Sequence, residues 1–453
     1  MENRLGAFLL SIILCGSCVA LHGADQALIE LLIDKGLLTE ADADTLSDRS
    51  SGVLPTGTDW ALVELLVSKG HLTQTDASTL GSAANRTAPI PEKPAPQVTL
   101  SPKSKNVTAL KMSGRIQAQY DSFGGVGSGA SDRDHFYFRR LFLGGHARLG
   151  DNWGGDIVLD FSDGKVFFEA ASAWFRAGDA LRIDVGQLKV PFGLEETTSA
   201  AKTKAIERSL VDRQFAEAVK FNARHAGIYA GGDLGYGLSY SLTYGNAGQN
   251  DNSQSGSLKA GEYGFEPDAQ GVWGQLRYDG IGDGIGFFGG IATGSMPMGV
   301  DDDGNDYTGG DFRAYNLFGG FEIGALNLEA EYMNGEADIP GASNEEHDGY
   351  MIQAAYTVRN PADGIWEFVY RYSTVEGSTP DTVNAKEVFR RAPISDPRAD
   401  GLHQHYIGLN YLIQGHDTKL MFGYEINTIE DAAGDGGADL EADGFRARLQ
   451  ILF

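Results

Sequence analysis

The feature that most constrains this chain is a period-two alternation of apolar and polar residues that returns in segment after segment between residues 109 and 453. In residues 110–120 the even positions are mostly apolar and the odd positions are polar, and residues 364–373 repeat the pattern with aromatic side chains. Strands of about ten residues with one apolar face are typical of a transmembrane β-barrel. A soluble β-sandwich would alternate in the same way, but the export signal, the strand length and the long acidic segments between strands favour the barrel.

About sixteen such segments can be delimited, an even number as a closed antiparallel barrel requires. A barrel of this size encloses a water-filled lumen rather than a packed core. Long connections at 246–269, 294–312, 374–402 and 428–441 are expected outside, and short ones, such as 280–283, are expected as periplasmic turns. The expected strand cores are 110–120, 136–149, 153–161, 166–176, 181–189, 225–233, 237–245, 270–279, 284–293, 313–324, 325–334, 347–358, 364–373, 403–413, 417–427 and 442–453. The fold class is therefore all-β, with a small N-terminal helical-hairpin repeat before the barrel.

Residues 1–23 resemble a secretory signal peptide, because a basic residue precedes an apolar stretch over residues 5–21 and small residues follow it. Cleavage is expected between Ala20 and Ala24. An uncleaved anchor is the alternative, although the stretch is short for a spanning helix. Both cysteines of the chain lie inside this stretch. The mature protein would then lack disulfides, thiolate catalysis and cysteine-ligated metals.

Residues 24–80 hold two copies of one unit, Ala24–Leu46 and Thr58–Leu80, with leucines at helical spacing. Each copy predicts a short helical hairpin that is too small to be stable alone, so the two should pack on each other or on a partner. We expect either a periplasmic docking element or a structural spacer. Residues 81–108 are rich in proline and predict an extended linker, after which the barrel domain occupies 109–453.

The charge of the chain is strongly acidic, with 62 Asp and Glu against 36 Lys and Arg and a net charge of -26. A chain of this composition is not expected to bind nucleic acid, which requires basic surfaces. Basic and acidic residues are nearly balanced over 109–230, whereas 231–453 is rich in acids. The cations are therefore concentrated in the first strands and the segment that follows them.

That segment, residues 195–224, begins after Pro191 and Gly193, which end the strand 181–189. It is too long for a turn and too polar for a strand, and part of it has helical propensity. Folded into the lumen, it would form a constriction lined by positive charge. The alternative is an exposed amphipathic loop.

Alternation and this segment together predict which cations face the pore. Arg208 and Arg213 are expected at its narrowest part, while Arg139 is expected on the outer face near a strand end. Fixed charges of one sign at a narrow point raise the local concentration of counter-ions. Four acids also point inward, so no lysine ladder of a single sign is evident; they are Asp156, Asp160, Glu169 and Asp184. The candidate pore cations are Lys111, Arg115, Arg140, Arg148, Arg182, Lys189, Lys202, Lys204, Arg208 and Arg213.

Four short stretches resemble the phosphate-selective porin O and P family. Residues 186–193 (GQLKVPFG) are similar to its "GQ-x-K-x-PFG" stretch, and 138–144 (FRRLFLG), 207–211 (ERSLV) and 408–411 (GLNY) are similar to further family segments in the same order. The last strand, which ends on Phe453, resembles the signal read by barrel-assembly machinery. The resemblance covers 109–453 and implies a trimeric, sixteen-stranded outer-membrane porin with an inward-folded loop and cationic side chains that draw anions through it.

We therefore expect passive diffusion of small hydrophilic solutes with a preference for anions such as phosphate. A general or cation-preferring porin is an alternative, as is a structural barrel that tethers the envelope through residues 24–80. The expected partners are outer-membrane lipid and lipopolysaccharide, two further copies of the chain, and a possible periplasmic partner of residues 24–80. No cofactor is expected. No G-x-S-x-G motif occurs, so no enzyme is expected, although a serine and a histidine could still meet in space without a motif.

Overall fold

The computed structural model describes residues 107–453 except 128–129, 163, 247–269, 283–284, 298–309, 339–343, 360–363, 390–392, 395–397 and 433–437. The expected signal peptide, the helical repeat and nearly all of the linker lie outside the described residues. Their boundaries therefore stay predictions.

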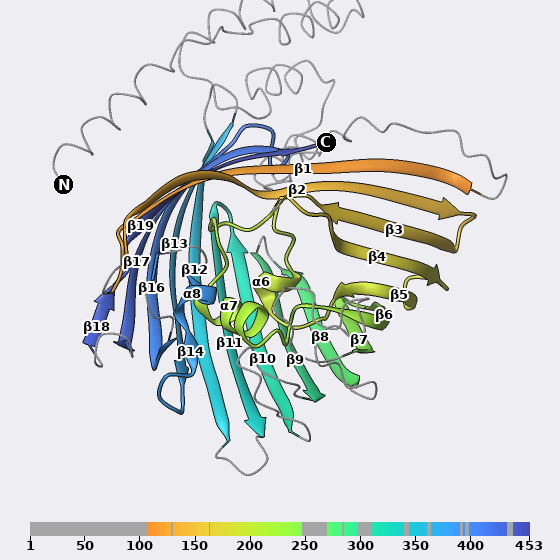
Figure 1. The fold of residues 1–453 in the computed structure, drawn as a ribbon. Coiled ribbons are helices and arrows are strands. Elements are labelled where there is room, and N and C mark those ends of the chain that lie inside the picture. Colours follow the sequence, from red (N-terminus) through yellow and green to blue (C-terminus); the bar gives the residue numbers. More distant parts are fainter. Residues whose placement is uncertain are drawn as a thin grey trace, which may run out of the picture. The chain divides into compact units, whose positions relative to one another are not determined.

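In the described part of the chain, sixteen strands form one closed antiparallel barrel (Figure 1). β1 pairs with β19, with Arg115 opposite Leu452, and this pairing closes the ring. β18 and β19 both pair with β17 and together form the sixteenth strand. The strands are β1 (Val107–Phe123), β2 (Arg133–Leu149), β3 (Trp153–Asp160), β4 (Phe167–Arg176), β5 (Arg182–Lys189), β6 (Arg224–Gly235), β7 (Leu238–Asn246), β8 (Gln270–Gly282), β9 (Ile285–Pro297), β10 (Asp311–Ile323), β11 (Leu326–Asp338), β12 (Glu345–Arg359), β13 (Ile365–Gly377), β16 (Gly401–Leu412), β17 (Thr418–Ala432), β18 (Ala438–Glu441) and β19 (Gly444–Leu452). The expected barrel of sixteen strands is confirmed.

Alternation assigns the two faces of the wall as predicted. On β13, Phe368 and Tyr370 are exposed on the outer face, whereas Glu367 and Arg371 are buried on the inner face. Because successive side chains of a strand point to opposite sides, the apolar residues form a band toward lipid and the polar ones line the interior.

A bulge in β2 breaks this alternation at Arg139. Gln117 of β1 pairs with Arg140, and the next residue, Ala118, pairs with Phe138, so Arg139 is an extra residue in the ladder. Both arginines consequently point inward, and Arg139 is buried against Glu207. The expectation that Arg139 lies on the outer face is wrong, because one inserted residue shifts the alternation of everything beyond it.

Several strands continue further than expected into their connections. Residues 294–297, 374–377 and 428–432 belong to β9, β13 and β17 rather than to loops. Their backbones still pair with the neighbouring strands, so the strands continue beyond the segments expected from alternation. Short turns, such as Gly324–Ala325 between β10 and β11, alternate with the longer connections at the other end of the barrel.

Two connections fold inward and fill part of the lumen, as Figure 1 shows for α6, α7 and α8. The first, residues 190–223, is called the inserted segment and contains α6 (Leu194–Thr197), α7 (Leu210–Arg213) and the π-helix η1 (Gln214–Ala218). The second, residues 378–400, contains β14 (Val383–Asn384), α8 (Ala385–Val388) and β15 (Arg398–Ala399). No helix among the described residues has the length and hydropathy to cross a membrane.

The hydrophobic core lies between these connections and the inner wall. Phe192, Phe215 and Phe221 of the inserted segment pack with Trp273 and Phe312 of the wall. A second cluster joins the other connection, through Val383 and Phe389, to Leu210. Burial of aromatic side chains is strongly favourable, so the two connections are packed against the wall and do not hang free in the channel.

Candidate functional site

The inserted segment is held to the wall by hydrogen bonds from strands far apart in the sequence. Lys419 of β17 donates to the Thr203 carbonyl at 3.0 Å, and Asn410 of β16 donates to the Lys204 carbonyl at 2.8 Å. Gln117 of β1 and Gln450 of β19 donate to the neighbouring carbonyls of residues 200 and 201. The prediction that this segment folds into the lumen and is not an exposed loop is confirmed.

Buried ion pairs add to this attachment. Glu207 lies between Arg139 and Arg448, each at 2.9 Å. Burial alone would raise the pKa of Glu207, but the two guanidinium groups hold it well below its usual range. Glu196 faces Arg208 at 3.0 Å and also contacts Lys189; against the effect of burial, these cations lower its pKa to about 2. Both carboxylates are therefore ionised at neutral pH.

Asp212 is the exception among the buried acids of the segment. Burial and, to a smaller extent, the nearby Glu196 raise its pKa to about 8 against the opposing effect of Arg208. Its Oδ1 accepts a hydrogen bond from Asn222 at 3.4 Å, and its Oδ2 lies 3.6 Å from the Arg208 guanidinium. Asp212, Glu196 and Arg208 thus share one buried site, and the two carboxylates in it differ in proton affinity.

Most of the predicted pore cations are engaged in this network or in the wall. Arg208 and Arg213 are buried and paired with Glu196 and Glu217. Lys204 pairs with Glu329 at 2.6 Å, and Arg140 donates to Gln117. Other predicted residues pair in the wall or lie at its rim: Lys189 with Glu196, Arg182 with Asp184 and Asp156, and the exposed Lys111 and Arg148. The contribution of these residues to selectivity stays a prediction.

Arg115 and Lys202 lie at the inserted segment and not at the rim, since Arg115 contacts the segment and Lys202 belongs to it. Arg115 is half-buried on β1, where it donates to the Ser199 hydroxyl at 3.2 Å and lies over the Phe142 ring. Lys202 is exposed. Among the residues that the structure describes, neither forms an ion pair with a carboxylate. Burial and, to a smaller extent, the positive charges of Lys419, Lys202 and Lys204 lower the pKa of His416, in the turn after β16, to about 4.

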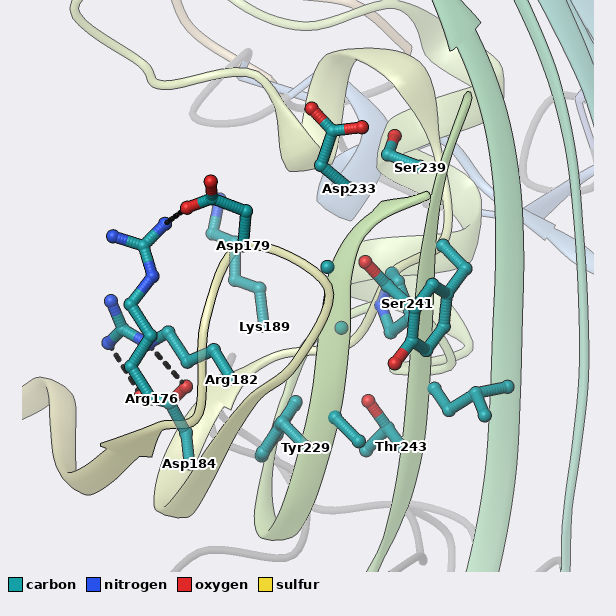
Figure 2. Close-up of a pocket in the computed structure, with 16 residues that line it drawn as sticks. Arg176, Asp179, Arg182, Asp184, Lys189, Tyr229, Asp233, Ser239, Ser241 and Thr243 are labelled. Atoms are coloured by element: carbon teal, nitrogen blue, oxygen red, sulfur yellow. Dashed lines mark hydrogen bonds and ion pairs between the residues drawn. The ribbon is translucent and has the colours of Figure 1, made fainter. Parts of the chain in front are cut away.

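A cavity of about 470 Å³ runs along the lumen side of β5, β6 and β7 (Figure 2). Ser239, Ser241 and Thr243 line it from β7. Figure 2 shows Arg182 paired with Asp184 and Arg176 paired with Asp179, so most charges here are matched. The charged lining of the cavity is nearly neutral, because three basic side chains are matched by three acidic ones.

The residues that hold the inserted segment were not found from the sequence. Glu195, Glu207 and Arg371 take part in its buried ion pairs, and of these three only Glu207 lies in a stretch that the sequence singled out, ERSLV. Arg371 and Glu195 are 176 positions apart. Partners at such separation cannot be identified from local pattern.

Known proteins match this chain in both sequence and fold. The model of a family described as phosphate-selective porin O and P matches residues 110–453. Porin O of Pseudomonas aeruginosa is 25% identical over 406 residues, which cover 76% of this chain and 88% of that protein. The anion-selective porin from Comamonas acidovorans superimposes with a TM-score of 0.52 at 14% identity, covering 76% of this chain and 99% of that one. Pseudomonas putida OprB gives a TM-score of 0.53 at 10% identity, with 76% and 94% covered.

Proposed function

This chain belongs to the family of phosphate-selective porins O and P and is an outer-membrane porin, and we propose that it conducts small hydrophilic anions, phosphate among them, in preference to cations. The observation that carries the preference is the pair Arg115 and Lys202, which present positive charge to the lumen without a carboxylate partner among the described residues. The name of the Comamonas acidovorans porin, which shares the fold, is in keeping with this proposal.

The size of the electrostatic interaction with a permeating ion explains why two such cations are enough to set an ion preference. A unit charge about 4 Å from a permeating ion contributes roughly 1 kcal/mol in water and about 4 kcal/mol at an effective dielectric constant near 20. Since about 1.4 kcal/mol corresponds to tenfold, even the lower value changes ion occupancy by roughly fivefold. Paired charges, such as Arg208 with Glu196, largely cancel at the distance of a passing ion.

The cation-preferring alternative depends on acids of the second half of the chain. Of those that contact the inserted segment, Glu329 pairs with Lys204, and Glu331 accepts from the Leu194 amide and from Asn316. These acids therefore hold the inserted segment to the barrel wall more than they attract ions. A structural barrel without transport is disfavoured by the match of residues 110–453 to a porin family and by the similarity to porin O of Pseudomonas aeruginosa.

The same proposal includes assembly and the N-terminal extension. We place a homotrimer interface on the outer face of β3 to β5, where two strands have only eight residues and large side chains such as Trp153 and Val185 are exposed. Residues 24–80 would lie in the periplasm as a docking element or spacer, and the outer face elsewhere would meet lipid and lipopolysaccharide. The channel requires no cofactor.

The zero-current potential of the purified protein in a planar bilayer under a potassium chloride gradient tests the ion preference. We expect the sign of an anion-preferring pore. The opposite sign would show that acidic residues dominate the lumen and would overturn the proposal.

A further inference from the structure

A serine, a histidine and an aspartate form a hydrogen-bonded chain on the lumen side of three neighbouring strands. The Ser113 hydroxyl of β1 lies 2.9 Å from Nε2 of His146 on β2. Nδ1 of the same imidazole lies 2.9 Å from Oδ1 of Asp156 on β3. The imidazole and the carboxylate remain 35% and 27% exposed, so the chain is accessible from the lumen.

The wall holds these groups rigidly. Ser113 is directly opposite Gly144, and His146 is directly opposite Asp156 in the antiparallel ladder. A Cβ atom at residue 144 would lie 2.4 Å from the Ser113 hydroxyl and 3.0 Å from the imidazole Nε2, so glycine is required for the two groups to meet. Arg182 lies 3.5 Å from the second carboxylate oxygen of Asp156 and orients it.

This order of groups is the one that activates a serine. A carboxylate beside Nδ1 favours the tautomer that carries its proton there, which leaves Nε2 free to accept the proton of the serine hydroxyl. Lys111 and Arg115 stand two positions before and after Ser113 on the same strand face. Their positive charges are placed to stabilise an oxyanion that forms near the serine.

We propose that Ser113 and His146 form an esterase site in the lumen wall, which cleaves small carboxylic esters, above all anionic ones, as they pass along the lumen. This activity goes beyond the proposed transport of ions and does not depend on ion preference. Ser113 is the nucleophile and His146 the general base, while Asp156 is a positioning residue that acts through the imidazole.

The reaction needs only water as co-reactant. His146 takes the hydroxyl proton as the Ser113 oxygen bonds to the ester carbonyl carbon, and the carbonyl π electrons move to oxygen. When the carbon–oxygen bond to the alcohol breaks, the imidazolium gives its proton to the leaving alkoxide. Water then attacks the acyl-serine, His146 accepts its proton, and the serine leaves with that proton while the carboxylic acid is released.

The first test uses a fluorophosphonate probe, with mass spectrometry of peptides from the purified porin. We expect covalent modification at Ser113, and turnover of 4-acetoxybenzenesulfonate faster than of the neutral 4-nitrophenyl acetate. Ser113→Ala should abolish both, whereas Ser241→Ala, a matched change at another lumen-facing serine, should leave both intact. Absence of modification at Ser113, or equal hydrolysis by Ser113→Ala, would overturn the proposal.

Further variants separate catalysis from a purely structural hydrogen-bond chain. Asp156→Asn should lower the maximal labelling rate by about a hundredfold without changing the probe concentration at half-maximal rate. His146→Ala should regain labelling when imidazole is added. Single-channel conductance, measured for each variant, shows whether its barrel has folded. If the hydrogen-bond chain from Ser113 to Asp156 were only structural, the probe would label the wild-type protein no faster than background.

A cysteine pair keeps the test decisive if a variant fails to fold. Ser113→Cys should react with iodoacetamide about tenfold or more faster than Ser241→Cys, because the imidazole promotes thiolate formation. The added change His146→Ala should remove this difference. Equal reactivity of the two cysteines would contradict activation by His146.

Discussion

Arg371 of β13 donates to the Glu195 carboxylate of the inserted segment at 3.1 Å, with both side chains almost completely buried. The same guanidinium also donates to the carbonyls of Glu207 and Arg208. One wall residue therefore binds three positions of the segment. The position of the inserted segment in the lumen therefore depends on a buried contact with the wall and not only on residues that meet the solute.

Replacing Arg371 by alanine should loosen the inserted segment. Removal of one partner leaves Glu195 buried without its charge partner, which costs about 3–5 kcal/mol in comparable cases. We expect larger and noisier single-channel conductance together with faster proteolysis within residues 190–223. Arg313→Ala is the matched control, because Arg313 pairs with Asp311 where both are exposed and such pairs contribute about 0–1 kcal/mol. Equal behaviour of the two variants would contradict the role assigned to Arg371.

The double substitution Arg115→Glu, Lys202→Glu should reverse the ion preference. Its effect on the permeability ratio should be at least about fivefold, from the charge energies given above, and zero-current potentials measure it. Arg148→Glu, at the exposed end of β2, should change the potential much less because its charge is screened by bulk solution. An unchanged potential in the double variant would remove the basis for the proposed anion preference.

Asp212 should make stability depend on pH in a direction opposite to that of most acids. Its folded pKa of about 8 lies above the value of about 3.9 for an unfolded aspartate. The folded state then holds the proton more tightly, so stability is greatest below the unfolded value and falls as pH rises toward 8. Asp212→Asn should reduce this loss, as measured by resistance to thermal unfolding between pH 5 and pH 9. A loss of stability that is equally steep in the variant would be the contrary result.

Glu196 should produce the reverse dependence at low pH. Its folded pKa of about 2 is below the unfolded value of about 4.3, so its contribution is present at neutral pH and is lost as pH falls through this window. We expect protease accessibility of the inserted segment to increase between pH 4 and pH 2. Glu196→Gln should show high accessibility already at pH 7, and a variant that keeps the acid-dependent step would argue against this assignment.

Deletion of residues 24–105, with residues 1–23 retained, should leave the barrel and its conductance nearly unchanged. The proline-rich linker predicts that the repeat and the barrel are independent units. Cross-linking and bilayer recordings measure assembly and conductance. Loss of oligomers in the deletion would mean that the repeat drives assembly.

The sequence predicted the barrel well because alternation is a local property of each strand. Residues such as Phe368 and Arg371 reveal their faces within a few positions. Arg139 was misplaced because a bulge adds one residue without changing composition. The pairing of Arg208 with Glu196, and the meeting of Ser113 with His146, depend on how the chain folds back on itself. The first contact requires the path of the inserted segment and the second the register of neighbouring strands, and no local pattern contains either.

The bulge at Arg139 also decides which changes of length β2 tolerates. Removal of Arg139 alone would restore strict alternation, leaving Phe136 and Phe138 toward lipid, so that only one positive charge would leave the lumen. Removal of Tyr137 would instead turn the preceding residues over, bringing Phe136 into water and His135 toward lipid. A single-residue deletion at this position therefore keeps the faces of the strand in register, and what it removes is the ion pair that Arg139 forms with Glu207.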